Sequence, residues 1–197
     1  MSHTASGVAF EAAPDAVEVA VRARRHLHRF PELSFEEHET SRYLCERLDE
    51  IGLPYRTGFA GTGVVARLET GRPGLVTAFR ADMDALPIRG LPFASEHAGV
   101  MHACVHDMHP GVLLGLAAQF RTMREQLVDT VVFIFQPGEE ANGGAARVIA
   151  DGALDQPAVE RIFALHAAPG LPVGSIATRA GAVTATDDDH AGVDPLR

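Results

Sequence analysis

Cysteine, histidine and acidic side chains gather in the middle of this 197-residue sequence, where residues 102–109 read HACVHDMH. Cys104 and His106 are two residues apart, so in a loop or an extended segment both side chains can point to the same side. Thiolate and imidazole groups together favour zinc or another borderline divalent ion. The segment therefore predicts a metal site.

Further polar groups follow apolar runs elsewhere in the chain. Asp82 and Asp84 come after one such run, Glu139 and Glu140 come after a second, and His166 ends a third. Open α/β sheets place their ligand sites where the strands end. If the apolar runs are strands, these side chains meet the cysteine-containing segment at one edge of the sheet.

The pair of neighbouring glutamates has a specific use at such a site. Glu139 and Glu140 normally point apart, which allows one to bind a metal and the other to face a metal-bound water, as general-base hydrolysis requires. Each group also has an ordinary interpretation: His166 as a structural residue, the glutamates as a solvated loop, and Cys104 as a small core residue. Spacing alone leaves both interpretations open.

Helical and strand patterns alternate along the chain. We expect helices over residues 15–29, 34–51, 111–124 and 145–151, and strands over residues 62–68, 75–80, 130–135, 161–165 and 173–178. Ser34 and Glu37 have the spacing of a capping box, and Gly52 supplies a helix stop. The runs TVVFIF (130–135) and RIFAL (161–165) are apolar enough for central strands covered on both faces. The alternation indicates an α/β layered fold.

Composition excludes several classes of partner. Lys and Arg number 17 against 26 Asp and Glu, and the resulting net charge of −9 disfavours nucleic acid and anionic membranes. The basic residues 22–29 indicate only an exposed helix face. No stretch approaches the roughly 18 apolar residues of a membrane span, and the N-terminus does not look like a secretory signal. Two cysteines are too few for a disulfide framework, which favours a cytoplasmic location.

The segment HACVHDMHPGVLLGLA resembles the signature HACGHDxHxxxLLGAA of the M20 peptidase family, in its amidohydrolase branch. That branch includes hippurate hydrolases, N-acyl-amino-acid amidohydrolases and hydrolases of auxin–amino-acid conjugates. Four more segments agree in order: RRHLHRFPELSFEEHET, RADMDALPI, VVFIFQPGEEANGGAARVIADGALD and ALHAAPGLPVGSIATRAGAV. The resemblance runs from about Arg24 to Val183.

Carried over residue by residue, the resemblance implies that Cys104, His106, Glu140 and His166 bind metal and that Glu139 is the catalytic acid/base. It implies divalent ions, two in number, of a type such as Zn, Mn, Co or Ni. In the family's mechanism a water that bridges the ions loses a proton to the glutamate and attacks a polarised amide carbonyl. The glutamate then protonates the leaving amine.

Other residues of the motifs receive supporting roles or none. We interpret Asp82 and Asp84 as groups that support the site, while His102 and His109 remain unassigned between supporting and structural roles. Val105 stands where the family signature has Gly. A glycine there allows a backbone angle that valine adopts only with strain.

The resemblance implies a zinc-exopeptidase-like catalytic domain, an α/β three-layer sandwich with a mostly parallel mixed sheet. We expect a flexible leader over residues 1–13, a partial catalytic domain over 14–184 and an unstructured acidic tail over 185–197. The lid domain through which family members often form homodimers, and the family's final metal-binding histidine, have no counterpart in this sequence. We therefore expect an unprotected sheet edge or apolar patch.

The leading hypothesis is a metal-dependent amidohydrolase that cleaves the amide bond of N-acyl amino acids, hippurate among them, or of small peptides. Its rival is a truncated, catalytically inactive fragment that only binds metal. A redox protein is a weaker reading because Cys45 lies in an expected helix and forms no CxxC pair. The sequence GGAA after Asn142 lacks the Lys-Ser/Thr of a phosphate loop.

Overall fold

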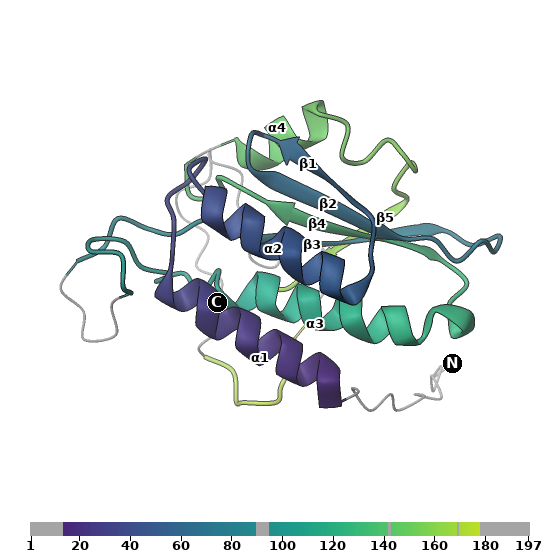
Figure 1. Cartoon of the computed structure of the whole chain (residues 1–197), viewed down its shortest axis with the longest axis horizontal. Helices are drawn as coiled ribbons and strands as arrows, with labels where there is room; N and C mark the ends of the chain where they lie inside the picture. The colour runs from purple at the N-terminus through teal and green to yellow at the C-terminus, as the bar shows by residue number, and fades with distance from the viewer. Residues whose placement is uncertain (1–13, 90–94, 142, 169, 178–197) are drawn as a thin grey trace, which may run out of the picture.

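The computed structural model describes residues 14–89, 95–141, 143–168 and 170–177. Its elements in chain order are α1 (Pro14–Arg29), α2 (His38–Ile51), β1 (Tyr55–Phe59), β2 (Gly63–Leu68), β3 (Val76–Asp82), α3 (Met108–Thr122), the 3₁₀ turn η1 (Arg124–Gln126), β4 (Thr130–Gln136), α4 (Gly144–Ala150) and β5 (Arg161–Ala164) (Figure 1). The expected leader and acidic tail lie outside the described residues.

The strands form one sheet in the order β1-β2-β4-β3-β5. β3 pairs in parallel with β4 and β5, whereas β2 pairs antiparallel with β1 and β4. The expected α/β fold with a mixed sheet is confirmed. Its parallel part is confined to β3, β4 and β5, and that is the part whose strand ends carry the acidic and histidine residues singled out above.

The core lies on both faces of the central strand β4, which is buried along almost its whole length. Val131, Phe133 and Phe135 point to one face and pack among the side chains of α1, α2 and α3. Val132 and Ile134 alternate with them and point to the other face, toward α4 and the segment that follows it. The expectation that TVVFIF is a strand covered on both faces is confirmed.

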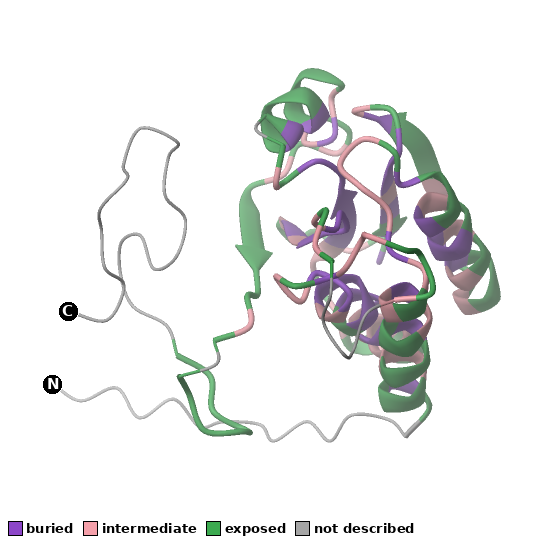
Figure 2. Cartoon of the chain, turned by 90° about the vertical axis from the view of Figure 1, so that its left-hand side faces the viewer, coloured by how far each residue is buried: buried purple, intermediate pink, exposed green. Residues whose placement is uncertain are grey.

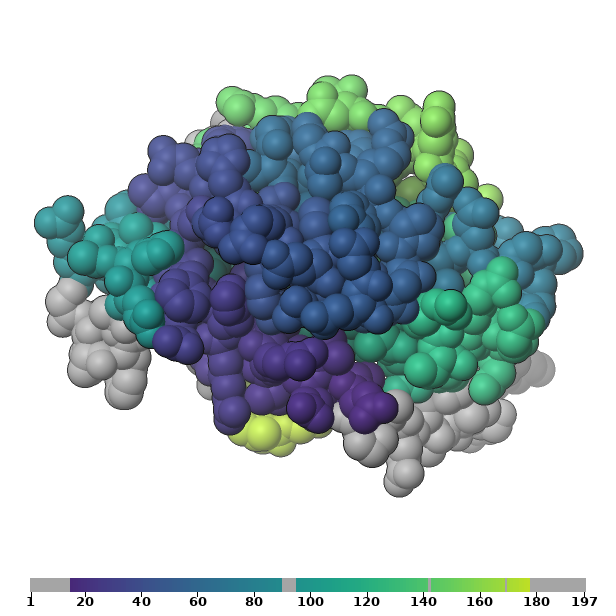
Figure 3. All heavy atoms as spheres, viewed as in Figure 1, coloured from purple at the N-terminus to yellow at the C-terminus, as the bar shows by residue number. Residues whose placement is uncertain are grey.

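Helices thus form a layer on each side of the sheet. α1, α2 and α3 lie together on one face and α4 lies on the other (Figure 1). In the space-filling view from the same side, the atoms of α2 lie over the middle of the molecule and those of α1 lie below them (Figure 3). In the part of the chain that the structure describes, no helix has both the length and the apolar character needed to cross a membrane.

The prediction that RIFAL is a central strand is wrong. β5 pairs only with β3 among the described strands, and all four of its residues are exposed (Figure 2). Ile162 and Phe163 are each 52% exposed. An apolar run indicates that a strand can bury its side chains, but it does not indicate how many neighbouring strands pair with that strand. The exposed β5 fits the expectation of an unprotected sheet edge.

A further strand was expected over residues 173–178, and this prediction is also wrong for the described part of that range. Residues 173–177 form a turn and irregular backbone. Apolar residues do not form a strand without a partner for their backbone groups.

The expected capping box at the start of α2 is wrong as well. The helix begins at His38, and Glu37 occupies the capping position without making a side-chain cap. Ser34 donates its hydroxyl to Asp84 instead, and Glu37 is fully buried. The C-terminal end agrees with expectation, because Gly52 ends α2 in the left-handed conformation with φ 77°.

Small residues set the contact between α1 and α3. A Cβ atom added at Gly115 would lie 2.8 Å from the Ala16 carbonyl oxygen and 2.9 Å from the Ala20 Cβ. At Gly111 it would lie 2.9 Å from the Ala20 carbonyl oxygen. Both glycines therefore allow the backbone of α1 to approach α3 closely. Because residues 102–107 lead directly into α3, this contact also fixes the base of the candidate metal segment.

We predict that Gly115→Ala destabilises the protein by about 1–3 kcal/mol, since the added methyl group forces α1 and α3 apart. Helix propensity alone predicts the opposite, a gain of about 1 kcal/mol from replacing Gly by Ala in a helix. Chemical denaturation of the two proteins measures the difference. A variant more stable than its parent would contradict the close contact.

Candidate metal centre

The parallel strands bring the predicted site residues to one end of the sheet. Asp82 ends β3, Glu139 and Glu140 follow β4, and His166 follows β5. The loop that precedes α3, residues 102–107, supplies the cysteine and a histidine to the same place. We call Cys104, His106, Glu139, Glu140 and His166 the candidate site.

His106 lies at the centre of the candidate site and is completely buried. Its Nδ1 lies 2.9 Å from the Asp84 carbonyl oxygen. Because a carbonyl can only accept, Nδ1 carries a proton, and Nε2 presents a lone pair whenever the ring is neutral. That Nε2 is buried without a hydrogen-bond partner, 3.7 Å from Glu139 Oε2 and 3.8 Å from Glu140 Oε1.

A neutral imidazole nitrogen that faces carboxylate oxygens in a buried place is stabilised by a cation between them. Glu140 Oε1 is likewise buried without a partner. Burial acts to lower the pKa of His106, but the Asp84 hydrogen bond and the negative charge of Asp82 outweigh it and raise that pKa to about 9. The site therefore attracts positive charge, either as a proton or as a metal ion.

Cys104 and His166 complete the other side of the candidate site, with Sγ and Nε2 3.8 Å apart. The His166 Nδ1 donates to the Ala167 carbonyl oxygen at 2.9 Å, so its Nε2 carries the lone pair that accepts from the Cys104 thiol. Burial, followed by the negative charge of Glu140, raises the pKa of the Cys104 thiol to about 11. The thiol is thus neutral until a cation replaces its proton.

The donor atoms fit a divalent metal ion in type and in spacing. Ligand atoms bound at about 2.0–2.3 Å around a tetrahedral ion lie about 3.3–3.8 Å from one another. The separations from His106 Nε2 to the two glutamates and from Cys104 to His166 are 3.7–3.8 Å. His106 belongs both to a group with Cys104 and His166 and to a group with Glu139 and Glu140.

Asp82 and His109 form a third group with His106, but their polar atoms already have partners. Asp82 accepts from Arg80 at 2.7 Å and from the His109 Nδ1. Burial acts to raise its pKa, yet these partners outweigh burial and lower it to about 2. His109 Nε2 accepts the Ala167 N–H at 3.3 Å and so holds the backbone beside His166. Asp82 and His109 are therefore placed to support the candidate site rather than to bind the metal.

Asp84 connects three parts of the site. Its Oδ2 accepts the Ser34 hydroxyl at 2.6 Å and the Glu140 N–H at 2.9 Å, while its carbonyl oxygen orients His106. Burial acts to raise the pKa of this carboxyl, and the hydrogen bonds from His106 and Ser34 outweigh it, so that the pKa is lowered. An ionised Asp84 is therefore built into the structure.

His102 is the motif histidine that the structure does not bring into any of the three groups. It is buried, and burial lowers its pKa to about 4. A residue that sequence reasoning missed is Asp107, whose Oδ2 lies 2.9 Å from both the Arg24 and the His28 side chains of α1. Asp107 anchors residues 102–107 to α1. The sequence signal that could have identified it is its position directly after His106.

Glu139 differs from the other acidic residues of the site because its side chain is 43% exposed. Partial burial, followed by the charges of Asp82 and Glu140, raises its pKa even though the charges of His106 and Arg80 oppose them. A carboxylate that reaches solvent and has a raised pKa is suited to accept a proton from water.

Val105 has the left-handed backbone conformation that its place in the signature suggested, with φ 66°. A β-branched residue is a marked outlier there, at a cost of about 1–2 kcal/mol. The turn is held by hydrogen bonds from the Val105 N–H to the His102 carbonyl and from the Met108 N–H to the Val105 carbonyl. This turn lies between Cys104 and His106 and directs both toward the site.

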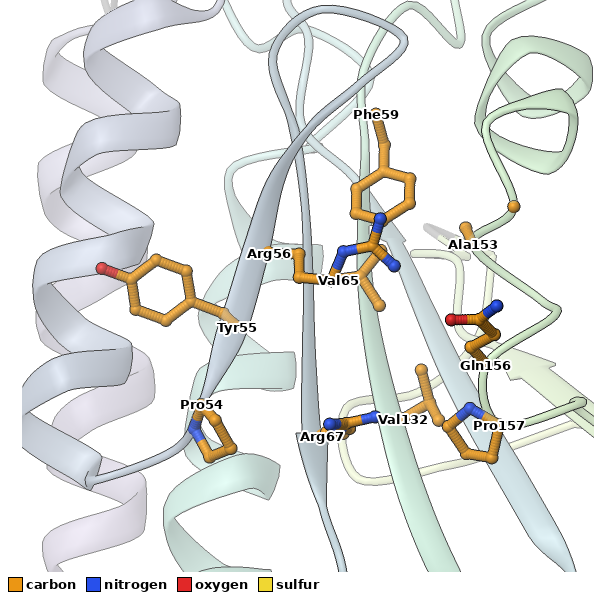
Figure 4. A pocket seen from close by; sticks show the side chains of 11 residues that line it. Pro54, Tyr55, Arg56, Phe59, Val65, Arg67, Val132, Ala153, Gln156 and Pro157 are labelled. Atoms are coloured by element: carbon orange, nitrogen blue, oxygen red, sulfur yellow. The ribbon is translucent and has the colours of Figure 1, made fainter.

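A separate pocket of about 80 Å³ lies against β1, β2 and the segment 152–157 (Figure 4). Its lining includes Arg56 and Arg67 but no histidine, cysteine or carboxylate. It therefore lacks the side chains that a metal ion needs.

Comparison with known proteins identifies a family and several similar proteins. The family described as "Peptidase family M20/M25/M40" matches residues 78–195. An IAA-amino acid hydrolase of Arabidopsis thaliana is 47% identical over 175 residues, which are 87% of this chain and 37% of that protein. An N-acetyl-L-cysteine deacetylase of Bacillus subtilis is 43% identical over 168 residues, 84% of this chain and 40% of that protein.

A solved structure is similar as well. A Bacillus subtilis protein described as a dinuclear metal-binding peptidase of the M20 family aligns with a TM-score of 0.79 and 41% sequence identity. The alignment covers 86% of this chain and 48% of that chain. The chain thus spans less than half the length of each of these relatives.

We predict that Val105→Gly stabilises the protein by about 1 kcal/mol, since glycine adopts a positive φ without steric cost. Val105→Ala is the matched control, because it removes the side-chain branch but keeps the Cβ that causes most of the strain. Thermal unfolding of the three proteins gives the comparison. Equal or greater stability of the alanine variant relative to the glycine variant would contradict the assignment of strain to this backbone angle.

Proposed function

Because this chain belongs to peptidase family M20/M25/M40, we propose that it carries the metal centre of a metal-dependent amide hydrolase. The observation that carries the proposal is the buried Nε2 of His106, which has no hydrogen-bond partner and faces the carboxylates of Glu139 and Glu140. A thiol and a second imidazole complete a donor set that suits a borderline divalent ion.

Each residue of the candidate site has a distinct role in this proposal. Cys104, His106, Glu140 and His166 hold metal, because their donor atoms belong to two groups that share His106. Glu139 is the acid/base, because it is the most exposed of the acidic groups in the cluster and has a raised pKa. Two ions fit the proposal best, since His106 is shared between two groups of donors and the similar solved structure is described as dinuclear.

Divalent ions bound here would polarise an amide carbonyl and make water more acidic. Glu139 takes a proton from the attacking water and later gives a proton to the leaving amine nitrogen. Asp84 keeps the His106 ring in the tautomer that leaves Nε2 free. His109 Nε2 accepts the Ala167 N–H and so holds the backbone beside His166.

N-acyl amino acids are the proposed substrate class. The relatives include proteins named for IAA-amino acids, N-acetyl-L-cysteine and N-acetyldiaminopimelate, which all contain an amide between an acyl group and an amino acid. Hippurate-like compounds belong to the same class. A thiol ligand requires a reduced Cys104, which suits a cytoplasmic protein. The metal would be Zn, Mn, Co or Ni.

A second candidate function is metal binding without hydrolysis. Metal content and hydrolysis of a panel of N-acyl amino acids, measured on the same purified protein, separate the two functions.

We predict that Cys104→Ser and His166→Ala each lower the bound metal by about tenfold or more, as the loss of a ligand does. Cys45→Ser is the matched control, because the second free cysteine lies on α2 outside the candidate site. Elemental analysis after dialysis against a limiting metal concentration gives the stoichiometry. Full metal content in both ligand variants would show that the metal lies elsewhere.

We predict that Glu139→Gln keeps the metal and loses about 10²- to 10⁴-fold in hydrolysis, since the amide keeps the shape but cannot take a proton. Hydrolysis is measured in this chain and in a chimera that continues with the remainder of the Bacillus subtilis relative. If the variant hydrolyses as fast as its parent, Glu139 is not the base. If it loses the metal instead, Glu139 is a ligand.

A further inference from the structure

Glu37 is a carboxylate in the interior of the protein, with an exposure of 0%. Its Oε2 accepts the Thr62 hydroxyl at 2.6 Å, and its Oε1 accepts the Gly138 N–H at 3.0 Å. Burial raises the pKa of this group. Within the described residues no cation lies within ion-pair distance of it, so its burial is costly. An apolar residue of similar size would fill the space at lower cost.

The partner of Glu37 lies next to the proposed acid/base. The Gly138 N–H belongs to the residue that precedes Glu139, and the Glu140 N–H on its other side donates to Asp84. A buried carboxylate therefore holds the backbone on each side of Glu139. Since the Glu139 side chain is 43% exposed, its own packing holds it weakly, and its position depends on these two backbone anchors.

Packing reinforces the same contact. Gly138 has φ 66°, and a Cβ atom there would lie 2.3 Å from the Phe35 ring. Phe35 also has a positive φ, of 64°, and its other contacts include the Arg147 guanidinium 4.3 Å from the ring centroid. The segment before α2 thus interlocks with the loop after β4 through Phe35 and Glu37.

We propose that Glu37 is a positioning residue that holds Glu139 and Glu140 at the metal centre through the Gly138 backbone. This inference rests on the proposed function. Misplacement of a reacting group by about 1 Å can lower the rate about 100-fold. This loss gives a physical reason to retain a costly buried carboxylate at position 37, where the capping-box interpretation expects a helix end.

The test compares three variants of this chain. Glu37→Met fills the space without an acceptor and leaves the Gly138 N–H unpaired. Glu37→Gln keeps an oxygen for Gly138, and its amide can donate to the Thr62 oxygen. Thr62→Val is the matched control, because it removes the other hydrogen bond of the same carboxylate and leaves the Gly138 contact intact.

Two readouts are measured in each variant: hydrogen exchange of the Gly138 amide, and the affinity for Zn²⁺ and Mn²⁺ by calorimetric titration. Glu37→Met should lower the Gly138 protection and weaken metal binding about 10- to 100-fold, as the loss of a group that orients a ligand does. Glu37→Gln should restore both, and Thr62→Val should lower the melting temperature without changing either. If Glu37→Met does not fold, Glu37→Asp, whose shorter side chain cannot span both partners, should change both readouts in the same direction.

The inference is overturned if Glu37→Met (or Glu37→Asp in its place) matches the unsubstituted chain in both readouts. It is also overturned if Thr62→Val reproduces the effects on Gly138 and on metal, because the role of Glu37 would then be only structural. Absence of metal binding in the unsubstituted chain would overturn the proposed function instead, and the exchange of the Gly138 amide would still report whether Glu37 holds that backbone.

Discussion

The candidate site depends above all on the parallel pairing of β3 with β4. Val76 lies opposite Thr130 at the start of this pair, and Asp82 lies opposite Gln136 at its end without any irregularity between. Both strands therefore end at the same end of the sheet, and the polar segments that follow them leave the sheet side by side. A shift of one residue would exchange the two faces of β4 and move Phe133 from the face covered by α1, α2 and α3 to the face covered by α4. The hydrophobic pattern that builds the core thus also sets the position of the chemistry.

Much of this arrangement could be predicted from the sequence, because periodicity and strand-end chemistry are local signals. The apolar run at 130–135 was recognised as a doubly covered strand, and the convergence of Cys104, His106 and the two glutamates was expected from the ends of the runs. What could not be predicted depends on contacts between distant segments. The apolar run of β5 carried no information about its edge position. The spacing of Ser34 and Glu37 resembled a capping box, although both side chains bind partners elsewhere in the fold.

Acidic side chains hold this region together from within. Asp82, Asp84, Asp107 and Glu37 are all nearly or fully buried, and each accepts hydrogen bonds from groups that belong to other elements. Such groups replace a continuous apolar core at the end of the sheet, where loops must cross. Carboxylates can accept several donors at once, so a few of them can fix several backbone segments. The cost is a local excess of negative charge, which a bound cation would neutralise.

The exposed position of β5 has a consequence for how metal and fold depend on each other. His166 follows an edge strand whose four residues are all exposed, and elements with few buried contacts open at low free energy. An ion held by His166 and the loop before α3 would tie this outer strand to the body of the protein, and opening of the strand would remove one of its ligands. Metal affinity and the docking of β5 are then thermodynamically linked: whatever covers the strand tightens the binding of the ion, and the ion in turn holds the strand in place.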